Sequence, residues 1–427
     1  MTVRRAIPAL AALALFAGLT ALYLSGQRAL YDHIIQLWGI RPYAQPFFDT
    51  RGLVSAIECL RQGVDAYVTN PCDPENRLYD YPPSWSLLTL LPVTQTWVEP
   101  IGIALGLAFV ASLLLLPAAR DRVGTVMVAA GAVSCTALFT VERANNDIVV
   151  FILSALAAAL LWRSAALRLL GYCMVQIAGL LKYFPMILMA AAVRELPRRF
   201  FIVAALSSAA VVLFALLTWH DLLRALGNIP KGAYIGEMFG AVNLGGGLVE
   251  LLALPPALVP VLRVIFTGLA LLIGLRLGLR ADTGAALARL DGRERSFLLV
   301  GALLITSCFF AAQSIDYRAV HMLLMLPSLI ALRGHNAPQR LQLAALGTLA
   351  LLWWDMLRIR IIWIGINAGD ALEPVIRIGG AWLLRELLWW WLMTVLISLI
   401  VGLMRGAPMI EWARERFSRG PATKAVS

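Results

Sequence analysis

Residues 200–218, FFIVAALSSAAVVLFALLT, form an unbroken apolar run without a single charged side chain. A helix of about 20 apolar residues spans the hydrocarbon core of a bilayer. Similar runs recur along the whole chain of 427 residues, which is 60% hydrophobic and 14% charged. Soluble domains carry about 25% charged residues. The composition therefore predicts an all-α, polytopic integral membrane protein.

Other apolar runs lie before and after this one. The first of them, at 7–24, follows a basic start and is long for a signal peptide, so it predicts a retained first helix rather than a cleaved signal peptide. The block 166–193 lies between Arg163 and Arg194 and is interrupted at Lys182, which predicts two short helices. The run 83–91 is too short to span, and fits a re-entrant or interfacial piece. With these, about twelve crossings are expected, the remaining spans lying near 98–117, 123–141, 147–162, 257–276, 297–312, 319–332, 341–357 and 384–404.

The basic residues, which give a net charge of +11, stand in short clusters between the apolar runs. This distribution is typical of cytoplasmic loops under the positive-inside rule, so we expect membrane lipids and no nucleic acid as partners. Both termini are then expected in the cytoplasm, and the protein is expected to be a multi-pass protein of the inner (cytoplasmic) membrane. The expected organisation is a transmembrane domain over 1–405, with a first external loop at 25–82, and a basic cytoplasmic tail at 406–427.

The first external loop carries Asp49 directly after Phe47 and Phe48 and before an amphipathic segment at 53–60. A carboxylate at a membrane surface can act as a general base towards a hydroxyl group. An aspartate before good helix formers is also a common helix N-cap. The residues alone leave both interpretations open.

Four cationic side chains lie near the same predicted outer edge. Lys182 interrupts an apolar block, where a charge indicates function unless the side chain snorkels to the interface. Arg143 lies in a short polar turn, Glu142 to Asp147, that either simply joins two helices or faces a phosphate. Arg318 and His321 begin a helix, and His321 lies one turn after Tyr317.

Two cysteines of this loop, Cys59 and Cys72, face an oxidising compartment and predict a disulfide. The segment Tyr81-Pro82-Pro83 predicts an extended, aromatic approach to the membrane. No metal-binding or nucleotide-binding pattern stands in a suitable context, so we predict no cofactor; a divalent-metal requirement stays open. The glycines at 245–247 indicate a flexible external segment.

In their order, these elements resemble the GT-C superfamily of membrane glycosyltransferases. The similarity is to polyprenyl-phosphate-mannose-dependent mannosyltransferases and related arabinofuranosyltransferases, and it covers about three-quarters of the chain. The motifs that carry it are, in chain order, FFDTRGL, GVDAYVTNPCDP, YDYPP, VERANND, LLKYFP and SIDYRAVHMLLMLP. The resemblance implies a GT-C-like bundle and an inverting hexosyl- or pentosyltransferase of the cell envelope, with mannose the expected sugar.

The resemblance also implies roles for particular residues. Asp49 is the catalytic base, and the donor's phosphate is bound by Arg143, Lys182, Arg318 and His321. The cleft for a polyprenyl-phosphate sugar donor and a lipid or glycan acceptor is formed by Asp65, Tyr67, Tyr81, Pro82, Pro83, Asn146 and Tyr317. Cys72 stands where the family has an aromatic residue, so acceptor recognition does not transfer.

Two other classes of function compete with this interpretation. A glycolipid transporter or flippase would use Lys182 as its substrate-binding charge, but it predicts polar residues at mid-membrane depth in several helices. A non-catalytic assembly protein of the envelope would not need Asp49. Here the polar residues gather at one predicted edge, which favours a transferase at the extracytoplasmic face.

Overall fold

The computed structural model describes residues 3–334 and 337–418, and nearly all of its secondary structure is helical. One short antiparallel ribbon, β1 (Met238–Phe239) with β2 (Ser314–Ile315), interrupts the helices. The helices are α1 (Val3–Leu24), α2 (Arg28–Leu37), α3 (Phe48–Arg61), η1 (Pro83–Leu90), η2 (Gln95–Trp97), α4 (Val98–Leu113), α5 (Arg122–Ala132), α6 (Cys135–Arg143), α7 (Asp147–Leu161), α8 (Ala165–Leu181), η3 (Phe184–Arg194), α9 (Pro197–Gly227), α10 (Asn243–Leu251), α11 (Leu258–Leu279), α12 (Ala281–Ala288), α13 (Gly292–Ala311), η4 (Asp316–His321), α14 (Met322–Ala331), α15 (Gln339–Leu352), α16 (Trp354–Ala368), α17 (Glu373–Val375), η5 (Ile376–Leu383), α18 (Leu384–Met404) and α19 (Pro408–Ser418).

Among the described residues, seven helical segments are long and apolar enough to cross a membrane, which makes this a helical membrane protein. They are Val3–Leu24, Gln95–Leu113, Arg122–Arg143, Pro197–Gly227, Leu258–Leu279, Gly292–Ala311 and Glu373–Met404. The expected number of twelve crossings is not confirmed, because several expected spans form shorter helices, among them α7, α8, α14 and α15.

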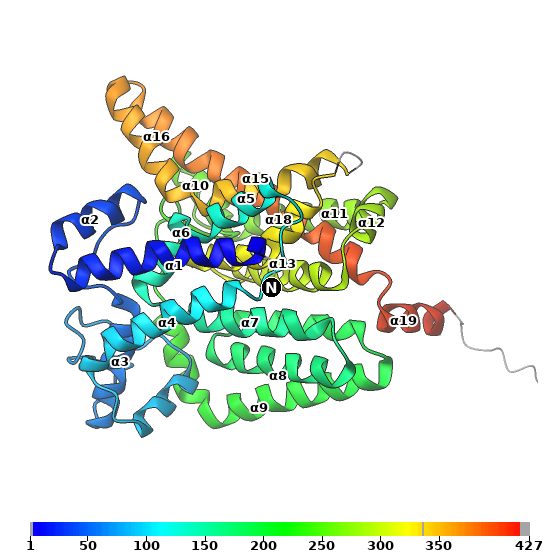
Figure 1. Cartoon of the computed structure of the whole chain (residues 1–427), viewed down its shortest axis with the longest axis horizontal. Coiled ribbons are helices and arrows are strands. Elements are labelled where there is room, and N and C mark those ends of the chain that lie inside the picture. Colours follow the sequence, from blue (N-terminus) through cyan, green and yellow to red (C-terminus); the bar gives the residue numbers. More distant parts are fainter. Residues whose placement is uncertain (1–2, 335–336, 419–427) are drawn as a thin grey trace, which may run out of the picture.

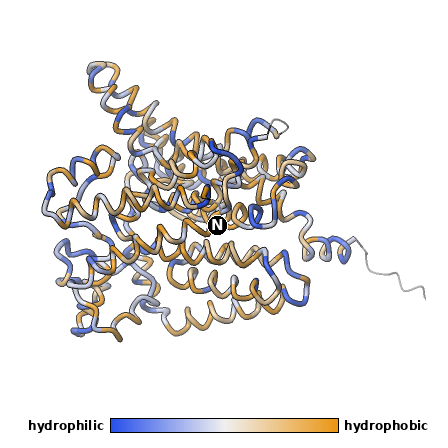
Figure 2. Tube along the Cα trace, viewed as in Figure 1, coloured by the Kyte–Doolittle hydropathy of each residue, from blue (hydrophilic) through white to orange (hydrophobic). Residues whose placement is uncertain are grey.

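Hydrophobic residues follow the lengths of the helices, and hydrophilic ones collect mainly in the segments that connect them (Figure 2). The helices α2 and α3 of the first loop lie at one end of the molecule, and α12 and α19 lie at the other (Figure 1). On the α2 side of the molecule, α16 projects away from the bundle (Figure 1). The molecule therefore has two distinct polar ends joined by apolar helices.

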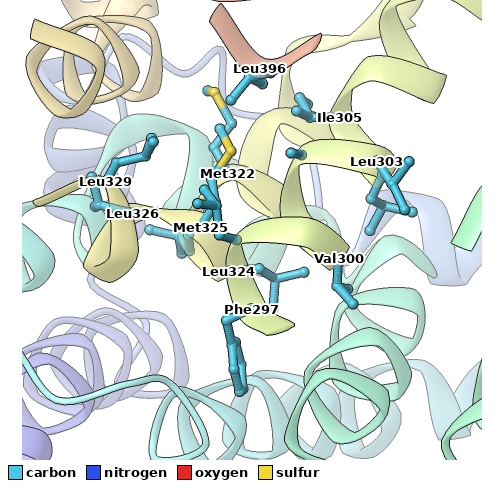
Figure 3. Close-up of a cluster of buried hydrophobic side chains, with 14 of the residues drawn as sticks. Phe297, Val300, Leu303, Ile305, Met322, Leu324, Met325, Leu326, Leu329 and Leu396 are labelled. Atoms are coloured by element: carbon cyan, nitrogen blue, oxygen red, sulfur yellow. The ribbon is translucent and has the colours of Figure 1, made fainter. Parts of the chain in front are cut away.

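The centre of the bundle is α13, which packs against α14, α18, η3 and α7. Asp291 and Glu294 form a capping box that begins this helix. Because it is apolar on all sides, it is buried on all sides. Gly301 permits its close approach to α14, since a Cβ there would lie 2.9 Å from Met325 Cβ. Figure 3 shows side chains of this core from α13, α14 and α18.

The expected span at 123–141 is divided into α5 and α6 at Val133 and Ser134. A break inside a bilayer leaves carbonyl groups that need donors. Trp38 Nε1 donates to Val133 O at 2.9 Å, and Trp353 Nε1 donates to Ala130 O at 3.0 Å. Ser134 Oγ caps α6 by accepting from Ala137 N at 3.2 Å. Indole N–H groups from distant parts of the sequence thus supply hydrogen-bond donors to two carbonyl groups at the break.

Three further expectations have clear outcomes. The expected break at Lys182 is confirmed, because α8 ends at Leu181 and η3 begins at Phe184. The prediction for residues 245–247 was wrong: these glycines lie buried within α10, where a Cβ on Gly247 would clash with the Trp382 ring. Of the basic tail, residues 406–418 contain α19, and residues 419–427 lie outside the described residues.

Cys59 and Cys72 are joined as a disulfide, with their Cα atoms 5.8 Å apart. We expect both thiols to resist alkylation in denatured, non-reduced protein, while Cys135, Cys173 and Cys308 react. Replacing the pair by serine should lower the free energy of unfolding by about 2–4 kcal/mol, because a crosslink restricts the unfolded chain. Mass mapping of alkylated peptides checks this, and five labelled cysteines without reductant would refute it.

Candidate functional site

The turn between α6 and α7 is the centre of the candidate site. α6 ends at Arg143, and Ala144 adopts the left-handed conformation with φ of 44°, which reverses the chain. Asn145 Oδ1 then accepts from Asp147 N at 2.8 Å, and Thr50 Oγ1 donates to Ala144 O at 2.6 Å. The turn is buried and is held against α3 of the first loop.

Asp49 lies in the first turn of α3 and faces this turn. Its Oδ2 accepts from Asn145 Nδ2 at 2.6 Å, and its Oδ1 lies 3.5 Å from Arg143 Nη1. The helix-cap interpretation was wrong, because Phe47 occupies the N-cap position and no side chain caps the helix. The Asp49 side chain is 14% exposed, so its carboxylate keeps limited access to a ligand.

Lys182 lies in the break between α8 and η3 and reaches the same turn. Its Nζ donates to Asn145 Oδ1 at 3.1 Å, to Asn146 Oδ1 at 2.6 Å and to Asp147 Oδ2 at 2.6 Å. The ammonium group is buried, so the snorkelling interpretation was wrong. Lys182 and Asp49 are therefore connected through the two ends of one amide, that of Asn145.

η4 brings Arg318 and His321 to the carboxylate of Asp147 as well. Arg318 Nε lies 3.6 Å from Asp147 Oδ2, and His321 Nε2 lies 3.2 Å from Asp147 Oδ1. The His321 side chain is fully buried, whereas that of Arg318 is 22% exposed. Direct contact with a ligand is thus open to Arg318, whereas His321 can act only through Asp147.

Aromatic rings enclose the cationic groups. The Arg143 guanidinium lies 3.9 Å from the centre of the Tyr43 ring and 5.0 Å from that of Phe139. Tyr317 packs edge-on against Phe139 with ring centres 5.6 Å apart, and Lys182 Nζ lies 5.9 Å from the Tyr317 ring. Such rings favour cations and exclude water from the groups behind them.

The Tyr81-Pro82-Pro83 segment lies on the Lys182 break, as expected for part of the same site. Tyr81 Oη is at 3.5 Å from the backbone oxygen of Asp49. Just beyond, Ser84 Oγ and Trp85 Nε1 donate to the oxygens of Leu180 and Leu181, at 2.6 Å and 2.9 Å. These two bonds satisfy carbonyl groups that the end of α8 leaves without helical partners.

Asp65 and Tyr67 are not brought into this cluster. Asp65 pairs with Arg224 at the end of α9, and its side chain is 46% exposed. Tyr67 packs edge-on against Tyr79, with ring centres 4.9 Å apart. Among the described residues, the hydrogen bonds, ion pairs and ring contacts of Asp65 and Tyr67 do not include Asp49. Their expected place in the cleft stays a prediction.

Sequence reasoning missed three residues of the cluster: Asn145, Asp147 and Asp80. The available signal for the first two was the polar turn between two apolar helices. Asp147 is fully buried and faces Lys182, Arg318 and His321 together. Burial raises the pKa of the Asp80 carboxyl to about 6, an increase that nearby Lys182 limits. Asp80 precedes Tyr81 and lies within electrostatic range of Asp49.

The raised pKa of Asp80 predicts a pH-dependent stability. An unfolded aspartate has a pKa of about 3.9, so this group favours the folded state below pH 4, and its contribution is lost as the pH rises through about 6. Asp80→Asn should therefore become more stable relative to the native chain between pH 4 and pH 7. Thermal unfolding in detergent across this range checks it, and a difference that does not change with pH contradicts it.

Comparisons with family models, with curated protein sequences and with solved structures found no match for this chain. The chemistry of the site therefore has to be argued from its own geometry.

Proposed function

We propose that this protein is an inverting glycosyltransferase that moves a sugar, mannose in our proposal, from a polyprenyl-phosphate donor to a lipid or glycan acceptor. The active site would lie at the outer face of the cytoplasmic membrane, in a GT-C-like helical bundle. The proposal rests on the ordered motifs of the sequence together with the cluster around Asp49. A donor carried on a lipid also suits a protein whose long apolar helices, such as Pro197–Gly227 and Leu258–Leu279, are mostly unburied.

The observation that carries the proposal is a carboxylate beside buried donor atoms that make no hydrogen bond, although Arg318 Nε lies within ion-pair distance of Asp147. Among the described residues, no hydrogen bond is made by Arg143 Nε, Arg318 Nε or Asn146 Nδ2, although all three atoms are buried. Buried polar groups without partners are uncommon in native proteins and need an explanation. An anionic ligand, such as a phosphate, would supply the missing acceptors, and Asp49 would lie at its edge.

The proposed reaction is a single displacement. The acceptor hydroxyl oxygen forms a bond to the anomeric carbon, and the bond between that carbon and the phosphate oxygen breaks. The hydroxyl proton passes to Asp49, and polyprenyl phosphate leaves with the bonding electron pair and one added negative charge. Attack from the side opposite the leaving group inverts the anomeric centre. Arg318 and Arg143 would stabilise the charge that develops on the leaving phosphate.

Lys182 has a different place in this scheme from the two arginines. Its three contacts already go to Asn145, Asn146 and Asp147. We expect it to act first by orienting the Asn145 amide, whose Nδ2 donates to Asp49. The hydrogen bond from Asn145 Nδ2 occupies Asp49 Oδ2. The other carboxylate oxygen, Oδ1, is then the one directed towards the acceptor hydroxyl. Direct contact between Lys182 and phosphate stays a prediction.

The test is a transfer assay with purified protein in lipid, polyprenyl-phosphate-mannose as donor, and total membrane lipids as acceptors. Mass spectrometry of the extracts should reveal a new hexose on a lipid, with release of polyprenyl phosphate. Asp32→Asn is the matched control for Asp49→Asn, because Asp32 is an aspartate of the same loop that pairs with Arg28 at 2.9 Å and has no predicted place in the cleft. Donor movement between leaflets without any sugar transfer would instead support a flippase.

A further inference from the structure

A groove is lined mainly by residues of α11 and α18. These two helices lie away from α3, which carries Asp49 (Figure 1). Its volume is about 470 Å³, and its walls are almost entirely aliphatic and aromatic. Phe266 and Trp390 meet near one end, with ring centres 5.8 Å apart. Ile273, in its wall, is 46% exposed, so the groove is open to the bilayer.

The groove has the length of one membrane leaflet. From Phe266 to Leu277 along α11 the rise is about 16 Å, taking about 1.5 Å per residue. Half of a hydrocarbon core of about 30 Å is about 15 Å. A single acyl chain that enters at one membrane surface and ends near the midplane would therefore fill it.

One end of the groove is basic. Arg340 lines it, and its Nη2 donates to Asp282 Oδ1 at 3.0 Å and to Thr283 Oγ1 at 2.7 Å. Its Nε is buried and has no partner among the described residues. Arg280 also pairs with Asp282, at 3.2 Å, and Arg405 donates to Leu279 O at 3.2 Å. Two arginines thus pair with Asp282, and a third binds the last turn of α11, where the groove reaches its end.

We propose that this groove binds one acyl chain of an anionic phospholipid, with the lipid phosphate at Arg340. The apolar wall matches the chain, the length matches one leaflet, and the excess of positive charge matches the phosphate. A zwitterionic phospholipid lacks the net negative charge. A polyprenyl chain is longer than the groove, so the site is separate from the donor site of the proposed function.

Native mass spectrometry of the full-length protein measures this directly. The protein is titrated with phosphatidylglycerol, with phosphatidylcholine of identical acyl chains, and with polyprenyl phosphate. A charge-assisted contact of about 1 kcal/mol per arginine corresponds to about fivefold tighter binding, and we expect this preference for phosphatidylglycerol. Arg340→Gln should abolish the preference, and Arg340→Lys should retain it.

Two tryptophan substitutions on α11 test the groove itself. Ile273→Trp fills the groove and should reduce phosphatidylglycerol binding by at least fivefold. Leu275→Trp is the matched control, because Leu275 lies on the same helix outside the groove lining and is also 46% exposed. Equal binding of both phospholipids, unchanged binding by Ile273→Trp, or preferential binding of polyprenyl phosphate would each overturn the proposal. None of these outcomes depends on sugar transfer.

Discussion

Asp49→Asn is expected to lower the rate of sugar transfer by about 10²-fold or more, while the protein still inserts and folds. The amide has the shape of the carboxylate but cannot accept the hydroxyl proton. Its oxygen can still accept from Asn145 Nδ2, which lies 2.6 Å from Asp49 Oδ2, so the contact with the α6–α7 turn is retained. The measurement is the initial rate of transfer at saturating donor.

Asp32→Asn and Asp49→Glu complete this experiment. Asp32 pairs with Arg28 on α2 and has no predicted place in the cleft, so its substitution should leave the rate within about threefold of the native rate, since exposed ion pairs contribute about 0–1 kcal/mol. Asp49→Glu keeps a base but moves it, and should restore a small part of the activity. Near-native transfer by a folded Asp49→Asn protein would show that Asp49 is not the base.

Lys182→Met is expected to lower both the stability of the protein and the rate of transfer, and this is the second largest effect that we expect. The reason is that the substitution removes the cation from a buried ion pair. Asp147 Oδ2 lies 2.6 Å from Lys182 Nζ. Loss of one partner from a buried pair typically costs about 3–5 kcal/mol of stability, since the remaining charge stays buried. Arg318 and His321 also face Asp147, so we expect a value near the lower limit. Transfer should fall as well, because Asn145 loses its anchor.

A double variant separates positioning from stability. In Lys182→Met with Asp147→Asn the buried negative charge is also removed, so thermal stability should largely return. The rate of transfer should stay low, because Asn145 Oδ1 then keeps the Asp147 backbone N–H but has lost Lys182, the charged donor that helps to orient its amide towards Asp49. Lys182→Arg should rescue only in part, since a planar guanidinium differs in shape from an ammonium. If Lys182→Met matched the native protein in both stability and donor titration, neither a positioning role nor phosphate binding could hold for Lys182.

Much of the candidate site could be predicted from residue types and their order. Charges within apolar runs are costly, so Lys182 and the turn from Glu142 to Asp147 were conspicuous in the sequence. The structure brings Asp49, Arg143, Lys182, Arg318 and His321 together with Asn146, Tyr81 and Tyr317. It leaves Asp65 and Tyr67 with Arg224 and Tyr79. Nothing in the local sequence distinguishes Asp49 from Asp65, because both follow apolar residues in one loop.

The membrane class and the break at Lys182 were determined by the sequence alone, because hydropathy and the cost of a buried charge act over one helix length. The tertiary structure decided which partner each charge has. Asn145 joins Asp49 to Lys182 only because α3, the α6–α7 turn and the α8–η3 break converge at one place. Asp147 contacts Lys182, Arg318 and His321 because η4 meets the same turn. It also decided that α5 and α6 are separate helices, since the indole donors of Trp38 and Trp353 come from distant segments. Contacts of this kind depend on packing in three dimensions, which no periodicity within a single segment encodes.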